Sequence, residues 1–189
     1  LLGAHKTEMT NNKDIIIGDN GIGILGLNKL TPTSQEDGFK ITQAANATIK
    51  YAGNGKSAFG VVALNNDGTS TTYTSDVTLG ANSQIDFSNT VGGIGVLLRG
   101  TKINFTDNGS IIKVGKQGRG IFIEDNSTSA ANAFTLALNG GKIEADGDGA
   151  IGVYSNKALS TAKAVDVQGK KSAGYYAKEN LTLLPNADI

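Results

Sequence analysis

Residues 15–23 read Ile-Ile-Ile-Gly-Asp-Asn-Gly-Ile-Gly, and residues 112–120 read Ile-Lys-Val-Gly-Lys-Gln-Gly-Arg-Gly, so the two stretches align without a gap. Each joins a triplet with apolar first and third positions to a Gly-led apolar strand, and this pair of elements recurs six times. The Gly-led strands begin at Gly23, Gly60, Gly95, Gly120, Gly152 and Gly174. The triplets before them begin with Ile15, Ile49, Ile85, Ile112, Ile143 and Val165. The chain is therefore an internal repeat of short strands.

A third apolar alternation often precedes the triplet, and the resulting three-strand unit varies in length. The alternation is weak in the first and sixth units and clear at Phe39/Ile41, Val77/Leu79, Ile103/Phe105, Leu136/Leu138 and Leu181/Leu183. Successive leading glycines lie 37, 35, 25, 32 and 22 residues apart. Helical repeats keep a fixed unit length, whereas a coil of short strands can lengthen at its corners. The irregular spacing and the two-residue alternation favour a β repeat.

Two β architectures fit these units. Asn-Gly pairs at 20–21, 54–55, 108–109 and 139–140 are typical of hairpin turns in an antiparallel sandwich or meander. The same residues suit the corners of a coil, because Asn and Gly both tolerate positive φ. Recurrence of the whole three-strand unit favours the coil. In a coil, the first residues of the six triplets would point inward and lie above one another as a ladder of mostly isoleucine. We predict an all-β, parallel β-helix of about six coils, roughly 30 Å long and cut from a longer solenoid. Residues 1–189 would form one domain, with 1–14 as a cap or a frayed edge.

The composition excludes several classes of function. The 189 residues include 17 basic and 17 acidic side chains, a single His (His5) and no Cys. Zero net charge without a dense basic stripe argues against nucleic acid as a partner. The absence of Cys excludes a disulfide scaffold, a Cys-ligated zinc and a thiol nucleophile, and one His leaves little for a triad or a His metal cluster. The short apolar runs cannot cross a membrane, and the missing initial Met indicates a longer parent chain.

Three patterns could carry chemistry, and each has a structural explanation. Residues 53–57 are similar to a phosphate loop, but Lys50 stands where that motif requires its first Gly. Residues 146–149, Asp-Gly-Asp-Gly, could donate carboxylates to calcium, but the pattern occurs once. β-Helical glycan enzymes need clustered carboxylates, whereas here the outward position of the triplet strand is occupied in turn by Ile16, Lys50, Asp86, Lys113, Glu144 and Asp166. We expect a charge ladder, no enzyme activity, no metal and no cofactor.

The longest insertions, 27–38, 65–75, 125–133 and 155–163, all follow the Gly-led strand. If the coils stack in register, these polar loops project from one corner of the rod, as binding surfaces of repeat proteins do. The alternative is that loops collect where insertion costs little free energy. The candidate ligand-binding residues on these loops are Thr31, Ser34, Gln35, Glu36, Asp37, Asn66, Asp67, Thr69, Tyr73, Asp125, Asn126 and Lys157.

The Gly-led units also resemble a known family. Residues 20–24 (Asn-Gly-Ile-Gly-Ile), 92–96 (Gly-Gly-Ile-Gly-Val), 118–122 (Gly-Arg-Gly-Ile-Phe), 149–154 (Gly-Ala-Ile-Gly-Val-Tyr) and 172–176 (Ser-Ala-Gly-Tyr-Tyr) are similar to repeats of type V autotransporter passengers, especially the large adhesins of the fusobacterial type. The resemblance implies a right-handed β-helix exported through the periplasm of a Gram-negative bacterium. It also implies display at the cell surface by a C-terminal outer-membrane barrel of the parent chain, or secretion. The lack of Cys fits passage through a narrow pore. The family's protease branch uses a Ser/His/Asp arrangement, which His5 cannot convincingly supply, and its adhesins share no binding motif.

Three functions follow as hypotheses. The first is an adhesin segment without catalysis that contacts a glycan or protein on host cells or partner bacteria through the loop row. The second is a spacer that holds a distal binding tip away from the membrane. The third is a β-helical polysaccharide lyase or hydrolase.

Overall fold

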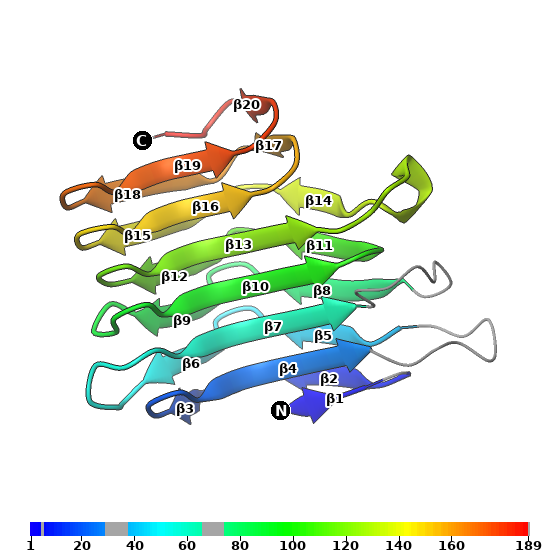
Figure 1. Cartoon of the computed structure of the whole chain (residues 1–189). Helices are drawn as coiled ribbons and strands as arrows, with labels where there is room; N and C mark the ends of the chain where they lie inside the picture. Colours follow the sequence, from blue (N-terminus) through cyan, green and yellow to red (C-terminus); the bar gives the residue numbers. More distant parts are fainter. Residues whose placement is uncertain (5, 29–37, 66–73, 189) are drawn as a thin grey trace.

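The chain forms a parallel β-helix. The computed structural model describes residues 1–4, 6–28, 38–65 and 74–188. Within these ranges every paired ladder of strands is parallel, and each strand pairs with the strand three elements later, except between β14 and β17. The coils rise from the N-terminus to the C-terminus with a right-handed turn (Figure 1). The predicted fold class is confirmed, and the antiparallel alternative is excluded.

Three sheets form the walls of the solenoid. Sheet A holds the Gly-led strands β1 (Leu2–Gly3), β4 (Ile22–Asn28), β7 (Phe59–Asn65), β10 (Ile94–Gly100), β13 (Arg119–Asp125), β16 (Ile151–Ser155) and β19 (Ala173–Ala177). Sheet B holds β2 (Glu8–Asn11), β5 (Lys40–Gln43), β8 (Ser75–Leu79), β11 (Ile103–Asp107) and β14 (Thr135–Leu138), and it is followed by a separate pair, β17 (Leu159–Thr161) and β20 (Leu181–Leu183). Sheet C holds β3 (Ile15–Ile17), β6 (Thr48–Tyr51), β9 (Gln84–Phe87), β12 (Ile111–Val114), β15 (Lys142–Asp146) and β18 (Ala164–Gln168).

Six complete coils run through these strands in the order B, C, A, from β2–β3–β4 to β17–β18–β19. The described part of the chain also contains a short 3-10 helix, Ala130–Asn132, between β13 and β14. No helix in the described ranges is long and apolar enough to span a membrane.

The predicted isoleucine ladder is confirmed in its full length. Along sheet C, strand pairing aligns Ile15, Ile49, Ile85, Ile112, Ile143 and Val165 one above another. All but Ile15 are buried. Stacked β-branched side chains keep a single rotamer and contact the same residue type in the next coil, so the ladder fixes the register of the whole rod.

The leading glycines are required because this ladder fills the space beside them. A Cβ atom on Gly120 would lie 2.6 Å from Cγ2 of Ile143 and 2.5 Å from the carbonyl oxygen of Gly152. Close contacts of the same kind occur at Gly23, Gly60, Gly95 and Gly152. The Gly row of sheet A and the Ile row of sheet C are thus two sides of one packing contact, which explains why the two elements recur together in the sequence.

The Asn-Gly pairs form corners of the coil. Each pair supplies one residue with positive φ: Asn20 at 57°, Gly55 at 89°, Gly109 at 106° and Gly140 at 141°. A corner that leads into a parallel neighbour needs this single reversal of the backbone. Asn-Gly pairs are therefore typical of both hairpin turns and coil corners, because both need a residue with positive φ.

Strands β2 and β17 are difficult to predict from the sequence, because each buries a polar side chain. Strand β2 buries Met9 and Asn11, and the side-chain amide of Asn11 donates a hydrogen bond to Oε1 of Gln43 at 2.9 Å. Strands β1 and β2 come from residues 1–14 and extend sheets A and B. Strand β17 lies inside 155–163, which was predicted to be a loop. That prediction was wrong, because only residues 156–158 connect β16 to β17.

A buried ion pair ties three coils together between sheets B and C. The ammonium of Lys163 lies 2.7 Å from the carboxylate of Asp107, and neither side chain is accessible to solvent. Lys163 also donates to the carbonyl oxygens of Ser110 (2.8 Å) and Gly140 (3.2 Å). The carboxylate in turn accepts N–H groups of Gly109 and Ser110. Burial lowers the pKa of Lys163 below its usual range, although Asp107 opposes the change.

The environment of Tyr175 in β19 predicts that the folded protein loses stability at alkaline pH. Its hydroxyl donates a hydrogen bond to the carbonyl oxygen of Lys163. Burial, and then the charge of Asp188, raise the pKa of Tyr175 to about 12, from an unfolded value of 10.0. The folded chain therefore keeps this proton between pH 10 and 12 while the unfolded chain loses it, so stability falls over that window.

We expect Tyr175→Phe to lose about 1 kcal/mol of unfolding free energy at pH 8, where only the hydrogen bond is missing. Between pH 10 and 12 the variant should lose less further stability than the unmodified chain. Guanidinium denaturation at several pH values measures both effects. Identical pH slopes for the two proteins would rule out this role of Tyr175.

Candidate functional site

Sheet B is interrupted between the fifth and sixth coils. Strand β14 forms the edge of the five-stranded sheet, and β17 pairs with β20 instead. The two halves meet again where the amide of Ala162 donates to the carbonyl oxygen of Leu138 at 3.0 Å. Sheets A and C continue through these two coils without a break, because β16 pairs with β19 and β15 pairs with β18. The wall of the solenoid is thus open on one side only, at the corner where sheet A leads into sheet B.

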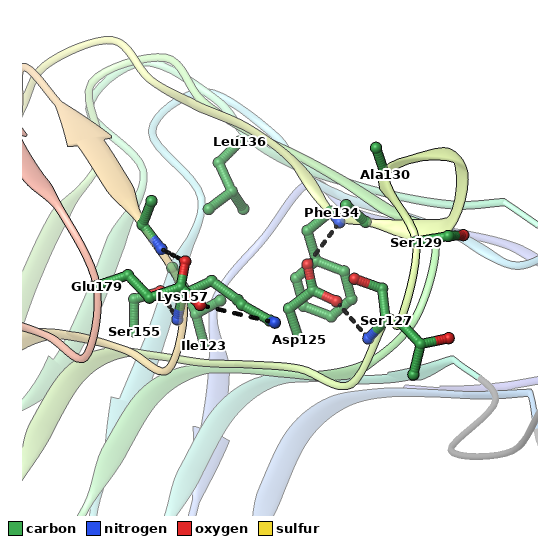
Figure 2. A pocket seen from close by; sticks show the side chains of 13 residues that line it. Ile123, Asp125, Ser127, Ser129, Ala130, Phe134, Leu136, Ser155, Lys157 and Glu179 are labelled. Carbon is green, nitrogen blue, oxygen red and sulfur yellow. Dashed lines mark hydrogen bonds and ion pairs between the residues drawn. The ribbon is translucent and has the colours of Figure 1, made fainter.

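A pocket of about 390 Å³ occupies this opening. Its inner part is apolar and is formed by Ile123, Phe134 and Leu136, while the hydroxyls and charges of the loops surround it (Figure 2). The remaining lining residues are Asp125, Ser127, Thr128, Ser129, Ala130, Ala133, Ser155, Lys157, Ala158 and Glu179. A concave site with an apolar floor and a few polar groups is typical of small-ligand binding.

The loop over the pocket is held by Asp125. Its carboxylate accepts the amide of Ser127 at 2.8 Å and the amide of Phe134 at 2.9 Å, so it joins both ends of residues 126–134. Asp125 is buried, with 6% of its surface exposed. This carboxylate therefore shapes the pocket and is already satisfied by the backbone.

The opposite wall comes from the next coil. The side-chain amide of Asn156 accepts from the amide of Asp125 at 2.8 Å and donates to the carbonyl oxygen of Asp125 at 3.0 Å, replacing a strand partner. Lys157 follows, and its ammonium lies 3.7 Å from the carboxylate of Glu179. Both side chains are about half exposed, so this pair can exchange its partner for a polar ligand at small cost.

The structure brings together two of the predicted site residues. Asp125 and Lys157 line the same pocket, whereas Asn126 is exposed outside it and its amide donates to the carbonyl oxygen of Gly100 at 2.7 Å. The other candidates lie outside the described residues: Thr31, Ser34, Gln35, Glu36, Asp37, Asn66, Asp67, Thr69 and Tyr73. Their flanking residues Asn28 and Asn65 pair in register at the end of sheet A, at the same corner as Asp125.

Sequence reasoning missed the apolar floor and Glu179. Phe134 and Leu136 follow the pattern of inward core residues and give no sign of a pocket. The informative signal is the difference in connection length at this corner. Nine residues (126–134) join β13 to β14, whereas residues 101–102 and 156–158 suffice in the coils below and above. A long loop between two short ones has no neighbour of equal length to pack against.

The other carboxylates considered as catalytic or metal-binding groups have structural roles. The predicted charge ladder is present on sheet C, where Lys113 lies 2.8 Å from Glu144. Lys142, which lies in the neighbouring row, adds an ion pair with Asp166 at 3.1 Å. Asp148 accepts the amide of Lys170 at 2.8 Å, and no group of three or more metal-binding side chains occurs among the residues that the structure describes.

Backbone amides of the corner at residues 53–57 are hydrogen-bonded within the protein. The amides of Gly55 and Lys56 donate to the hydroxyl oxygen of Tyr51, at 2.7 and 2.9 Å, and therefore do not form an open phosphate cradle. The hydrogen bond from Tyr51 holds the pKa of Asp19 below its usual range.

Comparisons with protein-family models, with curated proteins and with solved structures found no match for this chain. The functional inference therefore depends on the fold, the corner pocket and the resemblance of the Gly-led repeats.

Proposed function

We propose that the chain is a segment of a surface-displayed adhesin passenger and that the corner pocket contacts its ligand. The ligand would be a glycan or protein on host cells or partner bacteria, and the parent chain would be exposed at the surface of a Gram-negative bacterium. The pocket supports this proposal because it opens at the loop-bearing corner predicted to bind. It also combines an apolar floor with hydroxyls and one exchangeable ion pair.

The chemistry of the pocket suits recognition by packing and hydrogen bonds. Sugar rings and peptide side chains both present apolar faces beside hydroxyl, amide or carboxylate groups, and a floor such as Phe134 and Leu136 can cover the former. Ser127, Ser129 and Lys157 would meet the polar groups at the rim. Binding of this kind needs no covalent step.

The test is binding of the 189-residue chain to a glycan array and to whole bacterial and host cells. Ala158→Trp places an indole in the pocket at an exposed position, and we expect it to weaken saturable binding about tenfold or more. Lys157→Ala should weaken binding while leaving the fold unchanged, because its exposed ion pair contributes little stability. Lys116→Ala, at an exposed corner between sheets C and A, is the matched control and should bind normally.

The outcomes separate the candidate functions. A folded chain that binds no array component and no cell would contradict the adhesin proposal and favour the spacer. Binding that survives Ala158→Trp but is lost when 65–75 is shortened would move the site to those residues. Release of product from a polysaccharide panel would favour the glycan-processing enzyme.

A further inference from the structure

The outer face of sheet A is apolar over almost its full height. Strand pairing arranges its outward side chains in three rows along the solenoid. The central row contains Leu25, Val62, Leu97, Phe122, Tyr154 and Tyr176, and the row before it contains Ile22, Phe59, Ile94, Arg119, Ile151 and Ala173. The third row contains Leu27, Leu64, Arg99 and Glu124. No other described strand lies in front of this sheet (Figure 1).

The outward faces of sheets B and C are mostly polar, as expected for faces exposed to solvent. The outward row of sheet B contains Glu8, Lys40, Asp76 and Asn104. The outward row of sheet C begins with the exposed Ile16 and then contains only charged residues: Lys50, Asp86, Lys113, Glu144 and Asp166. A sheet with one solvated face normally alternates apolar residues inward with polar residues outward. The apolar outer face of sheet A is therefore a local exception, and apolar patches of this size mark interaction sites.

The three aromatic residues of the central row stack on one another within a single chain. The rings of Phe122 and Tyr154 stack with centroids 4.5 Å apart and planes 7° apart, and those of Tyr154 and Tyr176 stack at 5.3 Å and 2°. The guanidinium of Arg119 lies 6.0 Å from the centroid of the Phe122 ring. Side chains already fixed in this way lose little conformational entropy on association.

We propose that sheet A is a self-association surface, which binds sheet A of a second copy of this chain face to face. Seven strands at about 4.8 Å spacing and about 3.3 Å per residue give a face of about 700 Å² on each copy. Two such faces bury about 1,400 Å² in total, which lies within the range of specific, stable interfaces. Two sheets that meet through apolar side chains pack in the same way as the halves of a β-sandwich.

The charges on the face are complementary to a second copy. The face carries Arg99, Arg119 and Glu124, and Arg99 lies 3.3 Å from Glu124 within one chain. A two-fold axis along the strands, between Leu97 and Phe122, places Glu124 of each copy opposite Arg99 of the other. A two-fold axis along the solenoid places Glu124 opposite Arg119 of the other copy. Either symmetric arrangement leaves no carboxylate without an arginine.

The proposal is tested by sedimentation velocity of the 189-residue chain over a range of concentrations. We expect a reversible dimer. Leu97→Lys places a charge at the centre of the face and should weaken dimerisation about thirtyfold or more. Thr78→Lys is the control in the same coil, because Thr78 lies half-buried on the outward face of sheet B, and it should dimerise normally. Circular dichroism confirms that both variants are folded.

A second measurement locates the contact. Because the chain contains no Cys, Leu97→Cys introduces a single thiol at the centre of the face. Packed sheets lie about 10 Å apart, too far for a disulfide, so a short bismaleimide cross-linker should join two such thiols into a covalent dimer. Thr78→Cys should stay monomeric under the same conditions. A monomer at every concentration would overturn the proposal. A dimer that persists in folded Leu97→Lys, or that is lost equally in Thr78→Lys, would also overturn it. None of these outcomes depends on the ligand of the corner pocket.

Discussion

Asp107→Leu is expected to lower the free energy of unfolding by about 3–5 kcal/mol, because it leaves the ammonium of Lys163 buried without its counter-charge. Leu is chosen because it should cause little steric strain at this position. Strand pairing places Leu79 and Leu138 directly below and above Asp107 in sheet B, so the new side chain fits the ladder. The loss would then reflect the uncompensated charge and the amides of Gly109 and Ser110 that lose their acceptor.

The double variant Asp107→Leu/Lys163→Met separates these contributions. It removes the buried charge together with its partner, so it should be more stable than Asp107→Leu alone, although the two amides remain without an acceptor. Guanidinium denaturation of the two single variants and the double variant gives the coupling free energy. Additive losses in the double variant would show that the two side chains do not act as a pair.

Gly120→Ala is expected to destabilise the chain by about 3 kcal/mol, although it adds only one methyl group. The new Cβ would meet the carbonyl oxygen of Gly152 at 2.5 Å and Cγ2 of Ile143 at 2.6 Å. The carbonyl belongs to the next strand of sheet A and is fixed by strand pairing, so the contact is relieved only by moving two coils apart.

Gly18→Ala is the matched control, since a Cβ on Gly18 meets no atom within 4 Å. This exposed glycine should tolerate the change within about 0.5 kcal/mol. Thermal melts followed by circular dichroism compare the two variants directly. Equal melting temperatures would mean that the Gly row is not the packing requirement inferred from the structure.

The sequence alone predicted the ladders because they are periodic. The recurrence of Gly120 with Ile112 and Ile143 follows from two-residue alternation and from stacking of like on like. The corners were predictable for a related reason, since Asn20 and Gly109 supply the positive φ that a reversal needs.

The pocket and the buried ion pair could not be predicted, because both depend on which residues of neighbouring coils lie beside each other where the coils differ in length. The opening between β14 and β17 arises because the nine-residue connection 126–134 lies below the three-residue connection 156–158, a relation that the residues of neither loop reveal. Strand β17 was missed because its inward Thr161 is polar. Lys163, at a corner among charged residues, gave no sign that it reaches Asp107 two coils away.

The interrupted sheet has a mechanical consequence. A solenoid transmits tension from coil to coil, and its resistance at each junction is roughly the sum of the contacts with the adjacent coil. Between the fifth and sixth coils one of the three walls contributes little pairing beyond the bond from Ala162 to Leu138. If the chain is pulled along its axis, this junction should give way before the other junctions between complete coils. It is then held by the ladders of β15 with β18 and β16 with β19, and by the link from Lys163 to Asp107. The rod therefore contains a defined point of rupture beside its pocket.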